Sequence, residues 1–526
     1  MKKNLQNPDG TDVAPKLYHA GTLTYTKPAL VILFFWLLWG DFCFTVMESV
    51  TQPIMQLKFK ALEASNTEIG LILGTIPGIV YCTLNPIISF KSDRYRSRWG
   101  RRIPFILFSL PFIVMALVGM AYGDRLGFWL HAHLGILQKV SANHAAILTL
   151  AVLLVIFIFF NTFVTSTFWY LFRDIVPEHL LARFMSWFRL LGLGSSALYQ
   201  NFIFPYSDTH STQIFVGAAV LYLGGFGLMI LNVREGQYPP APPFIGGQTG
   251  PVAAITTYGK ECHSHAHYWY FWMLTFIGSI GGGAAVFNLF FLQRVGLDLF
   301  QIGRIQMTAS IVTAVLVLGA GWLADRYHPI RVVIAATIMG LFVTPVNLIW
   351  LFWHPSASAV WEWHAHWLQW VPMIHIQHWH LHMTHLGPLI RIRQVYLVQF
   401  CISVGLAAPV AALSAMWDPV LLMRIFPQER LGQFCSMNAV WRSAGSIIGA
   451  TLAGAALDFV GRRVGVDRAY FYIPIWGLVF TIPAFIFLLK MYKSWKRYGG
   501  DDAYVAPQLK ENLGAMPSPV PLAGPD

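Results

Sequence analysis

Two carboxylic acids and two neutral polar residues form one stripe near the start of the chain. Asp41 is followed by Thr45, Glu48 and Gln52 at spacings that place all four on one face of an α-helix. An ionised group at mid-bilayer costs about 3 kcal/mol on insertion scales, so this stripe must face protein or water. A buried carboxylate whose pairing changes can load and release a proton. We predict proton coupling at Asp41 first and Glu48 second.

Two further polar stripes each contain an arginine. Their members are Ser186, Arg189, Ser196 and Gln200 in the stretch 180–204, and Asn438, Arg442 and Ser446 in the stretch 432–456. Two acids and two arginines would nearly neutralise one another in a common cavity, and the arginines would equally suit a carboxylated substrate. The alternative for Asp41 is a static ion pair with one arginine, and for Glu48 also a position in the headgroup region.

Composition identifies the elements that must position these groups. The 526 residues are 56% hydrophobic and only 11% charged, whereas a soluble domain carries about 25% charged residues. This excludes a water-soluble enzyme. The apolar runs, such as residues 148–160, do not alternate with polar residues, which excludes a transmembrane barrel and leaves helices. The expected fold class is therefore an all-α integral membrane protein.

Apolar windows and helix breakers predict twelve transmembrane helices. They lie near 28–50, 67–90, 103–122, 147–171, 180–204, 211–232, 268–293, 302–324, 331–353, 394–418, 432–456 and 470–492. Of the lysines and arginines outside these spans, 23 fall on the side of the two termini and 11 on the other. This bias predicts that both termini are cytoplasmic, in a plasma or inner membrane. The net charge of +12 needs no nucleic-acid partner, because basic residues gather beside anionic lipid.

Short segments recur in the same order, which indicates two related halves of six helices. The pairs are Ser92–Tyr95 with Ala324–Tyr327, Glu68–Gly70 with Gln301–Gly303, His131–His133 with His364–His366, and Pro177, Phe184 and Ser186 with Pro427, Phe434 and Ser436. We expect a tail (1–27), a bundle (28–232), a linker (233–267), a second bundle (268–492) and a tail (493–526). Parallel halves of this kind place a substrate cavity between them and expose it to each side in turn.

Two loops resemble a known family signature. Residues 92–106 read SDRYRSRWGRRIPFI and residues 321–331 read GWLADRYHPIR. With twelve spans, over 28–492, they resemble the Asp-Arg loops of the major facilitator superfamily. The longer first loop resembles the sucrose-proton symporters of plants and their animal relatives, in the glycoside-pentoside-hexuronide group. The first span also resembles that of the animal branch, at Gly40, Phe42, Cys43 and Pro53. The sequence departs from the family pattern at two places. Ser89 stands where the signature usually has glycine, and the fourth span lacks the acid and the arginine that the plant symporters carry there.

The signature loops suggest a cytoplasmic gate. A carboxylate at a helix end can accept hydrogen bonds from arginines or from another helix's N-terminus and so hold one conformational state. The predicted gate residues are Asp93, Arg94, Arg101, Arg102, Asp325 and Arg326. The alternative is that the basic residues only set topology.

The resemblance implies a secondary active transporter, with proton-coupled symport of a sugar or glycoside, such as sucrose or another disaccharide, by alternating access. Amide and charged groups pair with sugar hydroxyls and aromatic rings stack on sugar faces. The predicted substrate-binding residues are Arg189, Arg442, Asn161, Asn288, Gln399, Asn438, Trp169 and Trp441. Each amide could instead join helices. Alternatives are an organic-anion carrier on the same fold and a non-transporting sensor or assembly factor.

No nucleotide-binding loop or catalytic set occurs, so we expect no enzyme activity, no cofactor and no drive by its own ATP hydrolysis. Nothing indicates oligomerisation, and we expect a monomer in the lipid bilayer. The loop 354–392 contains eight histidines among tryptophans. We interpret it as an extracytoplasmic amphipathic helix lying in the membrane interface, with metal binding or metal transport as the alternative.

Overall fold

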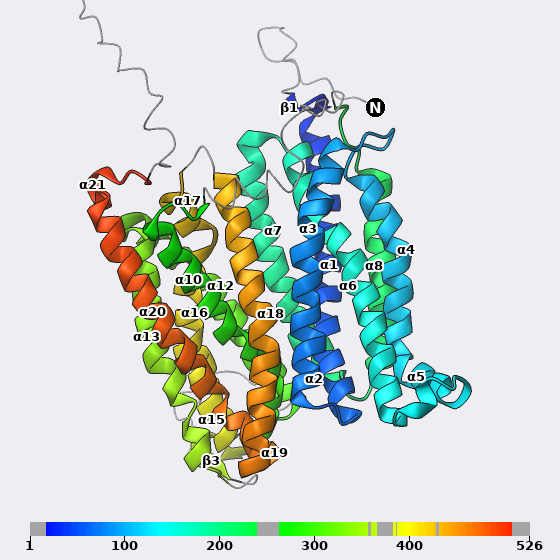
Figure 1. Ribbon diagram of the computed structural model, residues 1–526, viewed down its shortest axis with the longest axis vertical. Coiled ribbons are helices and arrows are strands. Elements are labelled where there is room, and N and C mark those ends of the chain that lie inside the picture. The colour runs from blue at the N-terminus through cyan, green and yellow to red at the C-terminus, as the bar shows by residue number, and fades with distance from the viewer. Residues whose placement is uncertain are drawn as a thin grey trace, which may run out of the picture. The chain divides into compact units, whose positions relative to one another are not determined.

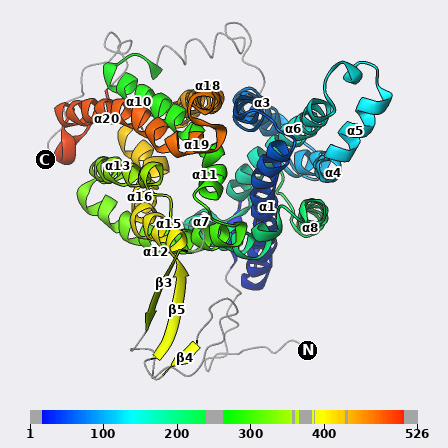
Figure 2. The same ribbon diagram turned by 90° about the horizontal axis from the view of Figure 1, so that it is seen from below.

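The computed structural model describes residues 17–238, 262–355, 359–364, 382–384, 387–427 and 431–507. The chain forms two compact units. The first consists of Met1–Pro243 with Leu297–Ile311, and the second of Phe244–Gly296 with Val312–Asp526. Both are built from long helices, which Figures 1 and 2 show from two directions.

In the first unit a two-stranded hairpin precedes the helices. Its elements are β1 Tyr18–Ala20, β2 Leu23–Tyr25, α1 Lys27–Ala61, α2 Asn66–Gly70, α3 Ile76–Arg94, α4 Ile103–Ala121, α5 Gly123–His133, α6 Ala142–Ile175, α7 Glu178–Leu198 and α8 Ser211–Asn232. A π-helical turn, Leu71–Thr75, joins α2 to α3. Ser65 and Glu68 cap the start of α2 reciprocally, which fixes where the chain re-enters the bundle.

The helices of the second unit are more often interrupted. They are α10 Ala266–Gly282, α11 Asn288–Arg294, α12 Leu299–Tyr327, α13 Pro329–Val346, α14 Ile349–Phe352, α15 Gln394–Phe400, α16 Ala408–Ser414, α17 Leu422–Ile425, α18 Leu431–Val464, α19 Val466–Ala469, α20 Ile473–Arg497 and α21 Gly500–Ala503. Residues Leu297–Ile311, at the start of α12, cluster with the first unit. Trp272, Phe426, Phe434 and Trp495 are part of a buried aromatic core.

Among the described residues, eleven helical segments are long and apolar enough to cross a membrane. Each overlaps one of the predicted spans, and the twelfth prediction, 180–204, overlaps α7. The all-α membrane prediction is confirmed. Several helices are longer than the apolar windows: α1 continues to Ala61 and α18 to Val464, because a helix does not need to end where its apolar surface ends.

The interfacial helix predicted for the histidine-rich loop is wrong at both ends of that loop. Residues Val360–His364 (β3), His382–Thr384 (β4) and Gly387–Arg393 (β5) are antiparallel strands in the order β3-β5-β4. The physical reason is visible in Ile390, Arg391, Ile392 and Arg393, which alternate apolar with basic residues, a period that suits a strand. His375 and His378, two of the possible metal ligands, lie outside the described residues.

Candidate functional site

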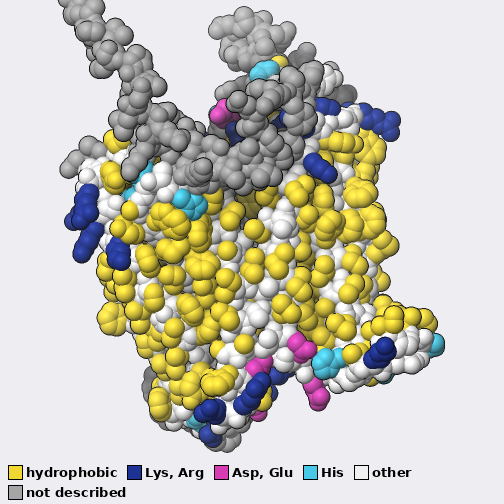
Figure 3. Space-filling view, viewed as in Figure 1, with side chains coloured by type: hydrophobic (Ala, Val, Ile, Leu, Met, Phe, Trp, Pro, Cys, Tyr) yellow, Lys and Arg dark blue, Asp and Glu magenta, His cyan; other side chains and the backbone are white. Residues whose placement is uncertain are grey.

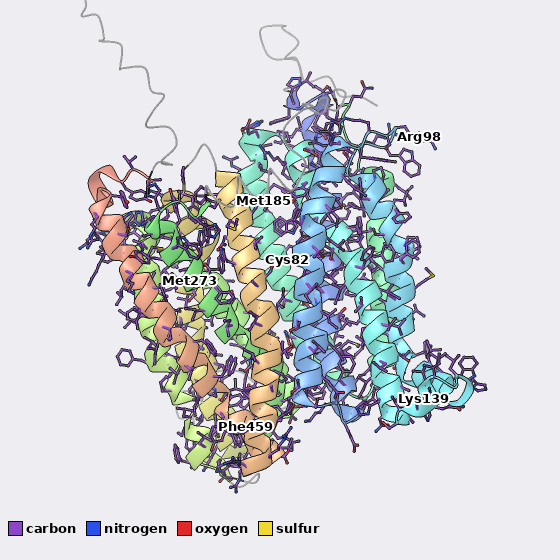
Figure 4. The ribbon with its side chains drawn as sticks, in the orientation of Figure 1. Cys82, Arg98, Lys139, Met185, Met273 and Phe459 are labelled. Atoms are coloured by element: carbon purple, nitrogen blue, oxygen red, sulfur yellow. The ribbon has the colours of Figure 1, made fainter. Side chains whose placement is uncertain are left out.

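A cavity of about 250 Å³ lies inside the first unit. Three helices surround it: Glu48, Thr51 and Gln52 come from α1, Leu73, Pro77 and Tyr81 from α3 and the turn before it, and Leu154, Phe157, Ile158 and Asn161 from α6. Cys82, which follows Tyr81, marks this stretch of α3 in Figure 4. The cavity combines one carboxylate, several neutral polar groups and two aromatic rings.

Glu48 and Asn161 meet in this cavity. The Asn161 side-chain nitrogen donates a hydrogen bond to Glu48 Oε1 at 3.2 Å. Asn161 itself is only 1% exposed, and its Oδ1 has no hydrogen-bond partner among the described residues. The Glu48 side chain is exposed although it projects from a helix inside the bundle, because it faces the cavity. A buried acceptor without a partner is costly, so a rearrangement of the cavity that brings a donor to Asn161 Oδ1 would be favoured.

Asp41, two helical turns away on α1, has the opposite environment. It is 2% exposed and lies beside the Thr45 hydroxyl. Its Oδ2 has no hydrogen-bond partner within the described part of the chain. A Cβ atom added at Gly192 of α7 would lie 3.9 Å from that oxygen. Because a buried carboxylate oxygen without a partner is costly, gain or loss of a proton at Asp41 would change the local free energy strongly.

Arg189 and Trp169 do not meet either acid. Arg189 is exposed on α7, one turn before Gly192, and no hydrogen bond or ion pair to it occurs among the described residues. Trp169 is half-exposed on α6 and packs edge-on against Phe188, with ring centroids 4.9 Å apart. The alternative for Asp41, a static ion pair with Arg189, is therefore not formed in this conformation.

The five substrate candidates of the second unit lie in different surroundings. Gln399 is buried, accepts from Trp350 Nε1 at 2.8 Å and donates to Ser403 at 3.0 Å, which fits a role in joining helices. Asn438 is buried, and its Oδ1 has no hydrogen-bond partner among the described residues. Trp441 donates to His263 Nε2 at 3.1 Å. Asn288 and Arg442 are exposed.

The predicted gate of the first half contains an ion-pair network. Asp174, at the end of α6, is 8% exposed and accepts from Arg101 Nε at 2.9 Å and from Arg102 Nε at 3.2 Å. Arg102 also donates to Ser92. The structure thus places Arg101 and Arg102 together within one unit. The side chain of Asp93 lies outside the described residues, and Arg94 is partly buried at the end of α3.

A second carboxylate binds the same loop through its backbone. The backbone N–H groups of Arg101, Arg102 and Ile103 donate to Glu235 at 2.8, 2.8 and 2.6 Å. This is the start of α4, where unpaired N–H groups favour an anion. Tyr238 donates to Glu235 at 3.1 Å. Burial, followed by the Glu235 and Asp174 carboxylates, raises the pKa of Tyr238 above its usual value.

The gate prediction did not include Asp174 or Glu235. Asp174 lies in the last turn of α6 and Glu235 in the connection after α8, and no spacing in the sequence relates them to residues 101–103. The clearest sequence signal is Gly100, whose φ of +103° permits the turn that exposes these N–H groups.

The corresponding gate residues of the second half have weaker contacts. Asp325 and Arg424 are both exposed, and their charged atoms are 3.9 Å apart. Arg326 lies over the rings of Trp322 and Tyr327. An exposed pair at this distance contributes little stability, so this gate is held less tightly than the first.

Residues 37–371 match the model of the Major Facilitator Superfamily. A curated human relative, the "Membrane-associated transporter protein", is 40% identical over 81 residues, which are 15% of this chain and 14% of that protein. A mutant of the nucleoside transporter NupG is similar in structure, with a TM-score of 0.61 and 12% identity, covering 88% of this chain and all of its own.

Two other solved structures are also similar. A bacterial homolog of the human lysosomal transporter Spinster has a TM-score of 0.56 and 13% identity and covers 89% of this chain and 99% of its own. A D-xylose-proton symporter has a TM-score of 0.54 and 12% identity and covers 88% and 97%. At such identities these likenesses show the fold alone.

Proposed function

We infer that this chain, which belongs to the Major Facilitator Superfamily, is a proton-coupled symporter of a sugar or glycoside. The observation that carries this proposal is the pair of acids on α1: Asp41 is occluded, and Glu48 lines a cavity where Asn161 binds it. Two acids with different access to water are what a coupled cycle needs, because a proton must enter from one environment and be held in another.

The lining of the cavity favours a neutral polyhydroxylated substrate. Carboxylate and amide groups pair with hydroxyls, and the Tyr81 and Phe157 rings offer apolar surfaces to a sugar face. In the proposed cycle, substrate hydroxyls occupy the unused acceptor of Asn161. Rearrangement of α1 against α7 then opens Asp41 to the opposite side. At 100 mV, one proton supplies about 2.3 kcal/mol, enough to concentrate a neutral solute roughly 50-fold.

The proposed topology has both termini in the cytoplasm of a plasma or inner membrane, with bundles 28–232 and 268–492 as the moving halves. The linker 233–267 connects them. In this arrangement Arg101, Arg102, Asp174 and Glu235 lie at the cytoplasmic end of the first half. Their network supports a gate that keeps this end of the half rigid while the halves rock.

An organic-anion carrier is the second candidate. The observation that favours it is Arg189, an exposed arginine with no ion pair among the described residues. A non-transporting sensor is disfavoured, because a scaffold has no need for a polar cavity within its bundle.

The decisive experiment is uptake of labelled mono- and disaccharides by purified protein in liposomes, with and without an inward proton gradient. We expect gradient-dependent accumulation. Asp41→Asn should abolish accumulation and retain exchange, whereas Asp208→Asn, at an exposed turn, should behave as the native chain. Equal accumulation of substrate with and without the proton gradient would exclude proton coupling. Competition by carboxylates but not by neutral sugars would establish the organic-anion carrier. Absence of flux for every substrate tested would favour the non-transporting sensor.

A further inference from the structure

A short helix outside the spanning set projects from the first unit at the end opposite Arg101. α5 has 11 residues, too few to cross a bilayer, and it is followed by a connection to Val140 that leads into α6. Figures 1 and 2 show α5 extending away from the bundle beyond α4 and α6.

One face of α5 is fixed tightly to α6. Gly123 and Gly127 are buried in this contact. A Cβ atom at Gly127 would lie 3.0 Å from the Cβ of Ala146, and one at Gly123 would lie 2.5 Å from Leu150 Cδ2. Glycine is therefore required for the two backbones to approach this closely. The position of α5 is set by the protein, and its remaining faces are available to a partner.

The adjacent face of α5 is apolar and exposed. Leu126 and Trp129 lie one turn apart, Trp129 is 57% exposed, and its ring stacks on His133 at 4.6 Å. Beyond the helix, Ile136 is 81% exposed. Contiguous exposed apolar surface of this kind indicates a binding partner.

This apolar face continues the lipid-facing surface of the unit. Val118 and Tyr122 are exposed at the neighbouring end of α4, and Leu148 and Val152 on α6. Figure 3 shows hydrophobic side chains on the side of α5 that faces this apolar surface of α4 and α6, with basic and histidine side chains on its other side. Trp and His beside basic residues, here Arg125 and Lys139, are typical of a helix at the headgroup level. Lys139 is labelled in Figure 4.

We propose that α5 and residues 134–140 lie in the headgroup–acyl boundary of the leaflet at this end of the unit and tie α1 to that leaflet. The tie is Lys58, which is buried on α1 and donates to the Ala121 carbonyl and to Asp124 Oδ1, both at 3.2 Å. Lys58 thereby joins the helix that carries Asp41 and Glu48 to the junction of α4 and α5. Contact with α6 fixes the position of α5, the leaflet receives its apolar face, and Lys58 joins α5 to the end of α1.

The test uses nitroxide labels on single cysteines in a background with Cys43, Cys82, Cys262, Cys401 and Cys435 replaced by alanine. This background is used once its thermal unfolding matches that of the native chain. Labels at Leu126→Cys and Ile136→Cys probe the apolar face, and labels at Arg98→Cys and Asp208→Cys, in exposed loops outside the helices, are the controls in water. The protein is placed in phosphatidylcholine–phosphatidylglycerol vesicles, and collision rates with oxygen and with a water-soluble nickel complex are compared.

We expect the oxygen-to-nickel collision ratio to be several-fold higher at positions 126 and 136 than at 98 and 208. Equal, water-like ratios at all four positions would overturn the proposal. Line broadening at position 126 that disappears on dilution with unlabelled protein would instead identify a second copy of the chain as the partner. None of these results depends on transport, so they stand apart from the proposed function.

The Lys58 tie has its own test. Lys58→Met, with Asp124→Asn as the milder variant that keeps a hydrogen-bond acceptor, should increase the mobility of the label at position 126 in the same vesicles. Unchanged mobility in both variants would show that α5 is held without α1.

Discussion

The side-chain nitrogen of Asn161 on α6 lies 3.2 Å from the carboxylate of Glu48 on α1, and these two residues join their helices across the cavity. The bond orients both groups. It leaves Asn161 Oδ1 buried without a hydrogen-bond partner among the described residues, so a substrate hydroxyl could pair with this oxygen once the cavity rearranges.

Asn161→Ala should weaken substrate binding. The substitution removes a hydrogen bond to a charged group, which contributes about 1.5–3 kcal/mol, and also the unused acceptor. We expect the substrate concentration for half-maximal uptake to rise roughly 10-fold or more, measured in the liposome assay. Asn232→Ala at the exposed end of α8 is the matched control. An unchanged half-maximal concentration in Asn161→Ala would show that the cavity does not bind substrate.

Gly449→Ala should destabilise the second unit. Gly445 and Gly449 of α18 face α10, and a Cβ at Gly449 would lie 2.5 Å from the Ile280 carbonyl oxygen. Small residues four apart allow helix backbones to touch in lipid, and overpacking such a contact costs about 1–3 kcal/mol. We expect a lower midpoint of thermal unfolding in detergent. Gly278→Ala on α10, where a Cβ meets open space, should leave it unchanged, and equal midpoints for both variants would contradict the packing argument.

Gly100→Ala should release Glu235 from the loop between α3 and α4. The φ of +103° is unfavourable for alanine, and the added Cβ would lie 2.5 Å from Glu235 Cβ. Glu235→Ala removes the acceptor of three backbone N–H groups directly. Both should accelerate trypsin cleavage after Arg96, Arg98, Arg101 or Arg102 several-fold, with Gly194→Ala in open helix as control. Native cleavage rates in both variants would show that the contact between Glu235 and the backbone N–H groups of residues 101–103 does not order this loop.

His328 should make stability depend on pH. Its Nδ1 accepts from the Ile330 N–H at 3.3 Å at the start of α13, a role that requires an unprotonated nitrogen. Burial, and next the Arg424 guanidinium, lowers the pKa of His328 from 6.5 to about 4. Between these values the unfolded chain binds a proton that the folded chain excludes. Stability therefore falls as the pH drops through this window, and below it no further loss comes from this group.

The measurement is the thermal midpoint in detergent at about pH 7.5 and about pH 4.5. His328→Asn is the informative variant, because asparagine tolerates the φ of +68° and caps helices without titrating. Its midpoint should change less between the two pH values than that of the native chain. An identical change in both proteins would assign the pH dependence to other groups.

The sequence predicts the helical membrane fold and the position of each span because apolar run length and bilayer thickness are both properties of linear stretches of chain. It also predicts that Asp41 and Glu48 share a helical face, since that follows from helical spacing alone. The family resemblance rests on the loops 92–106 and 321–331, whose residues are adjacent in the chain.

Other features depend on the distance between residues of different helices, which no spacing along the chain contains. Asp174 and Glu235 bind one loop from 73 and from 132–134 residues away. Gln399, chosen for its polarity, has its hydrogen bonds satisfied by Trp350 and Ser403. The histidine-rich loop contains strands where composition favoured a helix.

The amino-acid sequence by itself therefore determined which residues form long apolar helices and along which helical faces they lie, because both follow from local periodicity. Only the tertiary structure decided that Asp41 is occluded against α7 while Glu48 opens onto a cavity beside Asn161. That difference arises from how closely α1, α6 and α7 pack, which depends on side chains contributed by all three helices together.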